Sequence, residues 1–444
     1  MGTAARACLV AWVGGLGWWL GAANPVGAEM SAAAPSLAAV IAEALERSAE
    51  LAAIRARVAA AETMVEPARA LPDPMASVGL SNIPVGEGTS LARDPMSGVM
   101  LMLSQQVPRA EKRRLRGIAQ AQEAKMLRRR ADDLRNRLSR DVRKAYLDLQ
   151  YLDQAIAITE QNKAIAEDLL AAAEARYAAG LGLMQDVFQA QVRLSRMLDM
   201  LLELGPQRAA AAARLNALRH RPPEEPIGRL AEVKRTEVLL DSQSLIQRAI
   251  RANPGLHAMA IEAERGETQA ALAAQEVRPD YTLSLSYMLR ERAAGSEMGG
   301  AEMWSVTVGF ELPWLRRRQR ADPMAAAARA EAESARQHRA AMENELRRMV
   351  SELVIEIGRA DQQLSLVESA LLPQAEAALA SSRAAYETGQ VEFASLLDSQ
   401  MSFYSEQLRR ASLLADRERR LAELDYLVAG PAAPPAEEAA DAAR

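Results

Sequence analysis

The stretch between Gly117 and Gly180 contains no glycine and no proline. An uninterrupted segment of this length predicts one very long helix, from about residue 109 to residue 178. A helix of about 65 residues is about 100 Å long at 1.5 Å per residue. No compact domain contains such a rod, so the long helices of this chain must pack side by side. Apolar residues spaced three and four apart form one stripe for that packing: Val142, Tyr146, Leu149, Leu152 and Ile156.

The chain contains this arrangement twice. RYAAGLGLMQDVFQAQ (176–191) matches AYETGQVEFASLLDSQ (385–400), an offset of 209 residues, whereas Pro108 matches Pro313 at an offset of 205. The difference of four residues is about one helical turn, so a helix lengthened by that amount keeps its buried face nearly in phase. The change in offset therefore supports a long helix in both copies.

Each copy predicts the same order of elements. A helix (about 35–70, then about 243–276) precedes two strands, a very long helix (about 109–178, then about 324–387), a Gly-centred turn and a return helix. The fold expected is mainly α with a small β part, built from duplicated long-helix hairpins. The predicted division is a signal peptide at 1–28, a first repeat at 29–217, a Pro-rich linker at 218–242, a second repeat at 243–429 and a disordered tail at 430–444.

The N-terminus has the three-part layout of a secretory signal. Arg6 precedes an apolar run over residues 9–23, and the small residues 26–28 suit signal peptidase, with Glu29 as the first mature residue. A retained membrane anchor is the alternative. The single cysteine, Cys8, lies inside this segment, so the mature chain is expected to have no disulfide, thiol catalysis or thiolate metal site.

Composition argues against nucleic-acid binding and against catalysis. The net charge is −4, whereas nucleic-acid binders usually carry a basic balance or patch. The three histidines, His220, His257 and His338, are scattered with no partner at helical spacing, so neither a zinc site nor a catalytic group is visible. We expect no cofactor, no metal site and no enzymatic activity.

The segment YTLSLSYMLR (281–290) alternates apolar and polar residues, the pattern of a half-buried strand. Residues 304–312 alternate in the same way, and Val99, Leu101 and Leu103 give a weaker match in the first copy. We expect about nine to eleven residues in each strand, a length that crosses a bilayer at a tilt. The apolar, lipid-facing residues predicted are Tyr281, Leu283, Leu285, Tyr287, Trp304, Val306, Val308 and Phe310.

Four strands per chain cannot close a barrel, because about eight is the usual minimum. An open edge is not tolerated in lipid, where each unpaired backbone group costs several kcal/mol. If the strands span a membrane, several chains must share one barrel. The alternative is a small sheet packed on the helices.

The duplicated order, the Tyr-x-x-Gly … Leu-Leu-Asp-x-Gln turn (386–400) and the NPGL helix start (253–256) resemble the TolC family of outer-membrane efflux factors. The pattern LP-x-P … Q-x-P-x-x-x-KRR within residues 71–114 is similar to the heavy-metal-efflux branch. The resemblance implies a homotrimer that shares a 12-stranded transmembrane β-barrel in the outer membrane of a Gram-negative bacterium. It also implies an α-helical barrel across the periplasm, which contacts a periplasmic adaptor protein and an inner-membrane pump.

The resemblance further implies a gate at the Gly-centred turns, which form the periplasmic tip of the family's tunnel. Two positions depart from the family pattern: Val391 stands where an Arg often occurs, and Ser395 where an acid can occur. Ordinary helix-hairpin residues are the alternative reading. The gate residues carried over are Tyr386, Gly389 and Asp398, with Tyr177, Gly180 and Asp186 in the first copy.

Two further features have two readings each. The basic clusters 112–116 and 316–320 follow strand-ending prolines, and either attract lipid phosphates or form a solvated face. Met100, Met102 and Met288 fall on the polar, lumenal side of the strands. They are either soft-metal ligands or, as methionines more often are, gap-filling apolar residues.

The function expected is therefore that of a passive outer-membrane exit duct, opened by an adaptor and an inner-membrane pump. Metal cations or small toxic compounds are the expected cargo. One alternative is a duct for type I protein secretion or for multiple drugs. An alternative of another class is a periplasmic coiled-coil scaffold.

Overall fold

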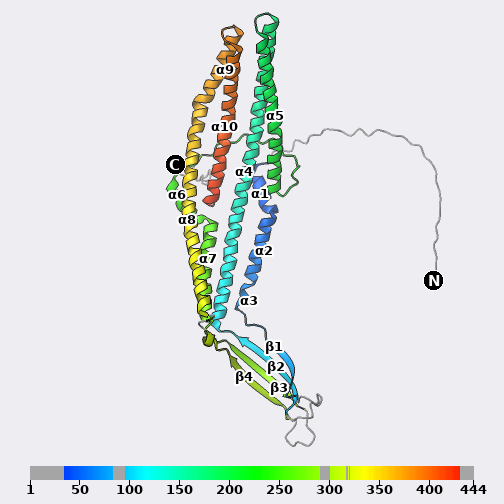
Figure 1. Cartoon of the computed structure of the whole chain (residues 1–444), viewed down its shortest axis with the longest axis vertical. Helices are drawn as coiled ribbons and strands as arrows, with labels where there is room; N and C mark the ends of the chain where they lie inside the picture. The colour runs from blue at the N-terminus through cyan, green and yellow to red at the C-terminus, as the bar shows by residue number, and fades with distance from the viewer. Residues whose placement is uncertain (1–34, 84–95, 291–300, 317–318, 320, 431–444) are drawn as a thin grey trace, which may run out of the picture.

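The computed structural model describes residues 35–83, 96–290, 301–316, 319 and 321–430. Long helices form a narrow bundle, and a small antiparallel sheet extends from one end of it (Figure 1). The signal peptide predicted at 1–28 and nearly all of the predicted tail lie outside the described residues.

The predicted order of elements is confirmed in both copies. The first copy contains α1 (Leu37–Arg47), α2 (Ala49–Thr63), α3 (Val65–Arg69), β1 (Met75–Ser81), β2 (Gly98–Val107), α4 (Ala110–Ala178) and α5 (Met184–Leu218). The second contains α6 (Ser242–Ala252), α7 (Pro254–Gln275), β3 (Tyr281–Leu289), β4 (Met303–Phe310), η1 (Pro313–Arg316), α8 (Ala321–Leu366), η2 (Val367–Leu371), α9 (Leu372–Glu387) and α10 (Phe393–Leu427).

The first helix of each copy, predicted as continuous, is broken. Ser48 caps α2, since its hydroxyl accepts a hydrogen bond from the Leu51 amide at 3.2 Å. Asn253 caps α7 in the same way, accepting from Leu256 at 3.0 Å. These two residues are separated by the repeat offset, so the break is itself duplicated. Ser and Asn side chains compete with the helical ladder for backbone N–H groups, which is why they begin helices better than they continue them.

The second long helix was also predicted as one piece. The structure divides it into α8, the π-helical turn η2 and α9. Pro373 lies in the first turn of α9, and its ring nitrogen has no hydrogen to donate to the preceding turn. The wider π turn accommodates the missing hydrogen bond, so the helix continues into α9 without a break.

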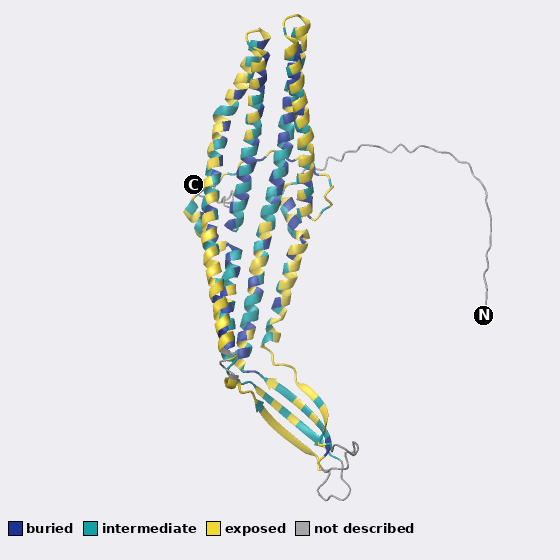
Figure 2. Ribbon diagram, in the orientation of Figure 1, coloured by how far each residue is buried: buried dark blue, intermediate teal, exposed yellow. Residues whose placement is uncertain are grey.

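The 69-residue α4 is the element on which both copies pack. It contacts α1, α2, α3 and α5 of its own copy and α7 and α10 of the other. In Figure 1, α5 lies along one part of α4, and α1–α3 lie along the rest of it. Several shorter helices placed end to end thus pack along one long helix. Of the predicted stripe, Val142, Tyr146 and Leu149 are buried, and they join a core with Val40, Ala44 and Leu215. The buried residues of the long helices lie inside the bundle (Figure 2).

The sheet has the order β1-β2-β3-β4, with every neighbouring pair antiparallel. The β2–β3 pairing joins the two copies, which leaves β1 and β4 as the two edges. The strands contain 7, 10, 9 and 8 residues in chain order, so β1 and β4 are shorter than expected.

A buried ion pair joins the sheet to the helices. The Lys112 side chain is only 2% exposed, and its Nζ lies 3.0 Å from Asp280 Oδ2 and donates to the Arg278 carbonyl at 3.0 Å. Asp280 Oδ1 also accepts from the Arg109 amide at 3.1 Å. Lys112 therefore belongs to a joint between α4 and the start of β3, and not to a lipid-facing basic cluster. Most of the other predicted basic cluster, 316–320, lies outside the described residues.

The joint predicts a measurable loss of stability. Asp280→Ala leaves the buried ammonium of Lys112 with only Glu276, at 3.6 Å, as a carboxylate partner. We expect a loss of about 1.5–3 kcal/mol, the contribution of a hydrogen bond to a charged group, because Glu276 compensates the ammonium only in part. Thermal loss of the helical circular dichroism signal in detergent measures the change. Glu111→Ala, which removes an exposed pair with Arg114 one turn away, is the matched control and should leave the transition unchanged. Equal midpoints for both variants would contradict the joint.

Candidate functional site

The sheet gathers its apolar residues on one face. Leu283 lies opposite Val308, and Leu285 lies opposite Val306. The face continues across the other strands, because Leu103 of β2 pairs with both Leu285 and Ala76. Val306 and Val308 are 57% and 61% exposed, so the described part of the chain does not cover this face. In Figure 2 the outermost strands of the sheet are largely coloured as exposed. A contiguous exposed apolar patch marks a surface that contacts protein or membrane.

Aromatic residues bound this face at two levels. Tyr281 pairs with Phe310 where β3 begins, and Tyr287 pairs with Trp304 six residues further along β3. Only aliphatic residues separate the two levels on this face of β3 and β4. Six residues of strand are about 20 Å long at 3.3 Å each. An aliphatic band between two aromatic levels is the arrangement of a lipid-facing barrel wall.

The opposite face of the sheet is mostly polar. The positions between the apolar ones hold Ser, Thr, Gly and Gln, together with methionines. Most of these residues on β2 and β3 are half-buried, whereas most of the apolar ones are exposed. The sheet therefore has one apolar and one largely hydrophilic side.

The two Gly-centred turns lie together at the other end of the bundle (Figure 1). Gly180 has φ +69° and Gly389 has φ +76°, left-handed conformations that cost a residue with a Cβ about 1–2 kcal/mol. Both glycines close a helix C-terminus, which is the position where this conformation is most common. The turns reverse α4 into α5 and α9 into α10.

Arg176 connects the two turns. Its Nη1 donates to the carbonyls of Tyr386 and Glu387 at 2.8 and 2.9 Å, and its Nη2 donates to the Leu181 carbonyl at 3.1 Å. Its guanidinium carbon also lies 4.8 Å from the centre of the Tyr386 ring. One side chain from the first copy thus bonds two carbonyls at the end of α9 in the second copy and one carbonyl of its own turn.

Tyr386 lies inside the core of this end and not on its surface. Its side chain is 4% exposed, and its ring centre is 5.1 Å from that of Phe393. Burial raises the pKa of Tyr386, and the nearby carboxylate of Asp186 raises it further. The Tyr386 hydroxyl has no hydrogen-bond partner among the residues described. The structure therefore brings Tyr386 close to Asp186 of the other copy.

Asp398 is exposed on α10, and its carboxylate lies close enough to Arg193 of α5 to affect that side chain. Burial lowers the pKa of Arg193, repulsion from Arg196 lowers it further, and the Asp398 carboxylate acts in the opposite direction. Asp398 therefore has a basic neighbourhood, whereas Tyr386 has an aromatic and apolar one. Tyr177, on the first copy, is about half exposed.

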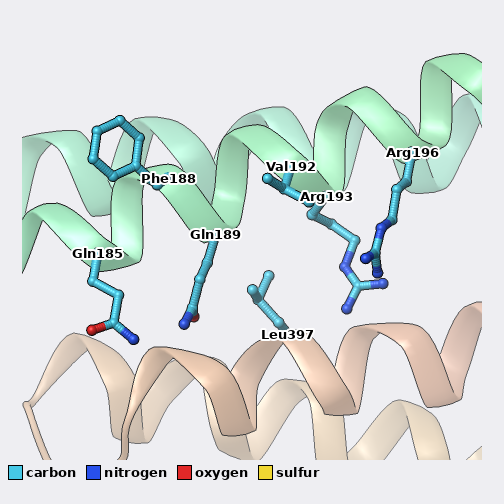
Figure 3. Close-up of a pocket in the computed structure, with 7 residues that line it drawn as sticks. All are labelled: Gln185, Phe188, Gln189, Val192, Arg193, Arg196 and Leu397. Atoms are coloured by element: carbon cyan, nitrogen blue, oxygen red, sulfur yellow. The ribbon is translucent and has the colours of Figure 1, made fainter.

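A groove of about 550 Å³ lies between α5 and α10 at this end (Figure 3). Gln185, Gln189 and Arg193 of α5 and Leu397 of α10 line it. Phe188 and Val192, four residues apart on α5, are 55% and 52% exposed beside it. This side of α5 is therefore an apolar stripe without cover from the described part of the chain.

The sequence matches the profile of the outer membrane efflux protein family over residues 40–219 and 245–430. The two matched segments cover most of both repeats. The chain belongs to the outer membrane efflux protein family. It is thus an efflux channel protein of the bacterial outer membrane and not an enzyme, as the sequence predicted.

Solved structures of channels have the same fold. The outer-membrane channel OprN is 17% identical, with a TM-score of 0.74 over 90% of this chain and 91% of its own. VceC from Vibrio cholerae is 19% identical, with a TM-score of 0.73 over 89% and 96%. CusC, described by its conformational changes on folding and transmembrane channel formation, is 15% identical, with a TM-score of 0.73 over 89% and 92%. No curated protein matches the sequence.

Two features are absent from the described part of this efflux protein. None of its described helices contains a stretch that is both long and apolar enough to cross a membrane. Nor do three His, Cys, Asp or Glu side chains gather anywhere in the described ranges in a way that would hold a metal ion.

Sequence reasoning missed Arg176, although a signal was present. Arg176 directly precedes Tyr177 in the last turn of α4, where a cation can satisfy the final carbonyls of a helix. What the sequence could not indicate is that the carbonyls would belong to a helix 210 residues away.

The Arg176 contacts predict a local effect on the α9–α10 turn. Arg176→Met keeps an apolar stem but removes the donors, and each hydrogen bond from a charged group contributes about 1.5–3 kcal/mol. Amide hydrogen exchange at Thr388, Gly389 and Gln390 should accelerate at least tenfold. Tyr386→Phe is the matched control: it removes a hydroxyl without a described partner and should leave exchange unchanged. Unchanged exchange in Arg176→Met would show that the two turns do not depend on this side chain.

Proposed function

We propose that three copies of the chain close one 12-stranded barrel in the outer membrane and one helical tunnel across the periplasm. The observation that carries this proposal is a four-stranded sheet with two open edges and an apolar outer face bounded by aromatic residues. Two copies would supply eight strands, a barrel whose interior is just wide enough for side chains to fill. Three copies supply twelve strands, which leave room for a passage.

The helices support the same assembly. The apolar stripe on α5, which includes Phe188 and Val192, is exposed in a single chain. In a closed ring, α5 of each chain lies next to a neighbouring chain. The helices in the second repeat of that neighbour cover the stripe. The same ring places the two Gly-centred turns of each chain around one axis at the periplasmic end.

The duct is passive. The described part of the chain holds no cluster of acidic, His or Cys side chains for a metal, and the family has no catalytic role. Energy for export comes from an inner-membrane pump, and a periplasmic adaptor couples that pump to the turns. Metal cations or small toxic compounds are the cargo that we propose, with the heavy-metal-like pattern at residues 71–114 as its support.

We assign the gate to the turn end, which is the end of the bundle formed by the two Gly-centred turns around Gly180 and Gly389. Its proposed residues are Tyr386, Gly389, Asp398, Tyr177, Gly180 and Asp186. Within it the roles differ. Asp398 is exposed and available to a ring of three carboxylates, whereas Tyr386 is buried beneath the Arg176 guanidinium and lies near Asp186. A ring of carboxylates attracts cations and repels anions. Because Val391 adds no charge beside it, closure is held weakly, and the adaptor opens it at low cost.

The assembly predicts a heat-modifiable trimer. The protein should fractionate with outer membranes and migrate as three chains on a gel without heating, then as one chain after boiling, because the described part of one chain supplies four strands, too few to close a barrel. Recovery of the protein as a soluble monomer from intact periplasm would contradict the proposal.

The assignment of the two sheet faces predicts a contrast between neighbouring residues. Val308→Arg places a charge on the apolar face and should cost about 2–4 kcal/mol of insertion free energy near the bilayer midplane. Thr307→Arg, on the hydrophilic face, should be far milder. Yield of heat-modifiable trimer in the outer membrane measures both. Equal damage from the two variants would contradict the assigned faces.

The gate predicts a change in conductance. Asp398→Ala should raise single-channel conductance in planar bilayers and weaken block by divalent cations added at the periplasmic side, because a carboxylate ring is removed. Tyr386→Phe alone should alter neither, since its hydroxyl is buried and has no described partner. If Asp398→Ala conducts and is blocked like the parent in an intact trimer, the constriction lies elsewhere.

A further inference from the structure

Four methionines meet on the hydrophilic face of the sheet. Met100 of β2 is the register partner of Met288 of β3, and Met288 is the partner of Met303 of β4. Met102 lies two residues from Met100, and therefore on the same face, opposite Ser286. Directly opposed residues have Cβ atoms about 4.5–5.5 Å apart. The four thioethers thus form one patch drawn from three adjacent strands.

Filling an apolar core, the ordinary task of methionine, does not explain this patch. The other positions of this face on β2–β4 are Ser, Thr, Gly and Gln, and no helix lies over the sheet in Figure 1. Met303 is 49% exposed. Apolar residues needed by lipid lie on the opposite face, where the strands place their Leu, Val and aromatic side chains.

The backbone leaves space for the patch. A Cβ added to Gly98, next to Met100 on the same face, would lie 3.2 Å from Met288 Cγ and 2.4 Å from the Leu289 carbonyl. Any larger residue at position 98 would displace the strand or the Met288 side chain. Glycine at this position thus leaves room for the Leu289 backbone and for the side chains of Met288 and Arg290.

We propose that Met100, Met102, Met288 and Met303 form a binding site for a soft monovalent cation, Cu⁺ or Ag⁺, on the lumenal wall of the barrel. This inference rests on the proposed function, because the hydrophilic face lines a lumen only in the closed barrel. Thioether sulfur is a neutral, polarisable ligand that favours Cu⁺, whereas Na⁺, Mg²⁺ and Ca²⁺ favour oxygen. Neutral ligands at an open wall bind weakly, as a conducting site requires for the ion to leave.

Arg290 tunes this site. Its Nε donates to the Met288 sulfur at 3.2 Å, which occupies one lone pair and brings a positive charge close to the site. A cation binds only when the Arg290 side chain moves away. Arg290→Gln should therefore increase the affinity for a soft cation, a result that a purely apolar role of the methionines would not produce.

Calorimetric titration of silver nitrate into the purified, full-length protein in chloride-free detergent tests the site, with Cys8 blocked by N-ethylmaleimide wherever it is retained. We expect one class of Ag⁺ site per chain, and no comparable binding of Na⁺ or Zn²⁺. Replacing all four methionines by Leu keeps the apolar volume and should weaken Ag⁺ binding at least tenfold. Met75→Leu is the matched control on the same face, near the other end of the sheet, and should bind like the parent. Arg290→Gln should bind several-fold more tightly.

Failure of the site and failure of the duct give different results. A protein that conducts K⁺ in planar bilayers but does not bind Ag⁺, or binds it equally well with four leucines, overturns the site and leaves the duct. Silver binding that is lost with the four leucines in a protein that forms no channels supports the site and overturns the duct. Unchanged affinity in Arg290→Gln would overturn the proposed position of the ion beside Met288.

Discussion

The open edges of the sheet are the constraint on which the assembly depends. The β1 and β4 strands each present a row of backbone N–H and C=O groups that no other described strand pairs. In lipid such groups cost several kcal/mol each, and only a closed barrel removes the edges. Because the outer face of the same strands is apolar, the sheet cannot remain in water either. A single chain therefore has no stable environment, and β4 of one chain must pair with β1 of a neighbouring chain.

The helices turn this local requirement into a long duct. The joint between Lys112 and Asp280 fixes α4 to the beginning of β3, so the sheet and the bundle are one unit. Buried polar contacts further along set the position of α10 against α4: Thr159 meets Tyr404 at 3.0 Å, and Asn162 donates to Gln407 at 2.7 Å. Polar pairs in an apolar interface favour one register over its neighbours. The turn end is thereby held at a defined distance from the membrane.

The sequence was sufficient for the features that depend on local pattern. The stretch without Gly or Pro after Gly117, together with Pro108 before it, predicted α4 within a residue of its limits, and alternation predicted β3 and the apolar face that pairs with β4. Breaks that depend on a single cap, such as Ser48, were missed, since the helical pattern continues through them. Contacts between the copies could not be predicted, because nothing near Arg176 indicates that its acceptors lie in another helix. The placement of Tyr386 in the core likewise depends on that distant packing.

Cross-linking of the sheet edges tests the shared barrel most directly. Cysteine at Val78 on β1, combined in turn with cysteine at Trp304, Val306 or Val308 on β4 in a Cys8→Ser background, is treated with a short bis-maleimide in outer membranes. Within one chain these two strands are the opposite edges of the sheet, so a cross-linked product must join two different chains. The account predicts that at least one pair gives a ladder of two and three chains that ends at three, and that single-cysteine chains give none. A ladder that ends at two or continues beyond three, or no product from any pair, would contradict it.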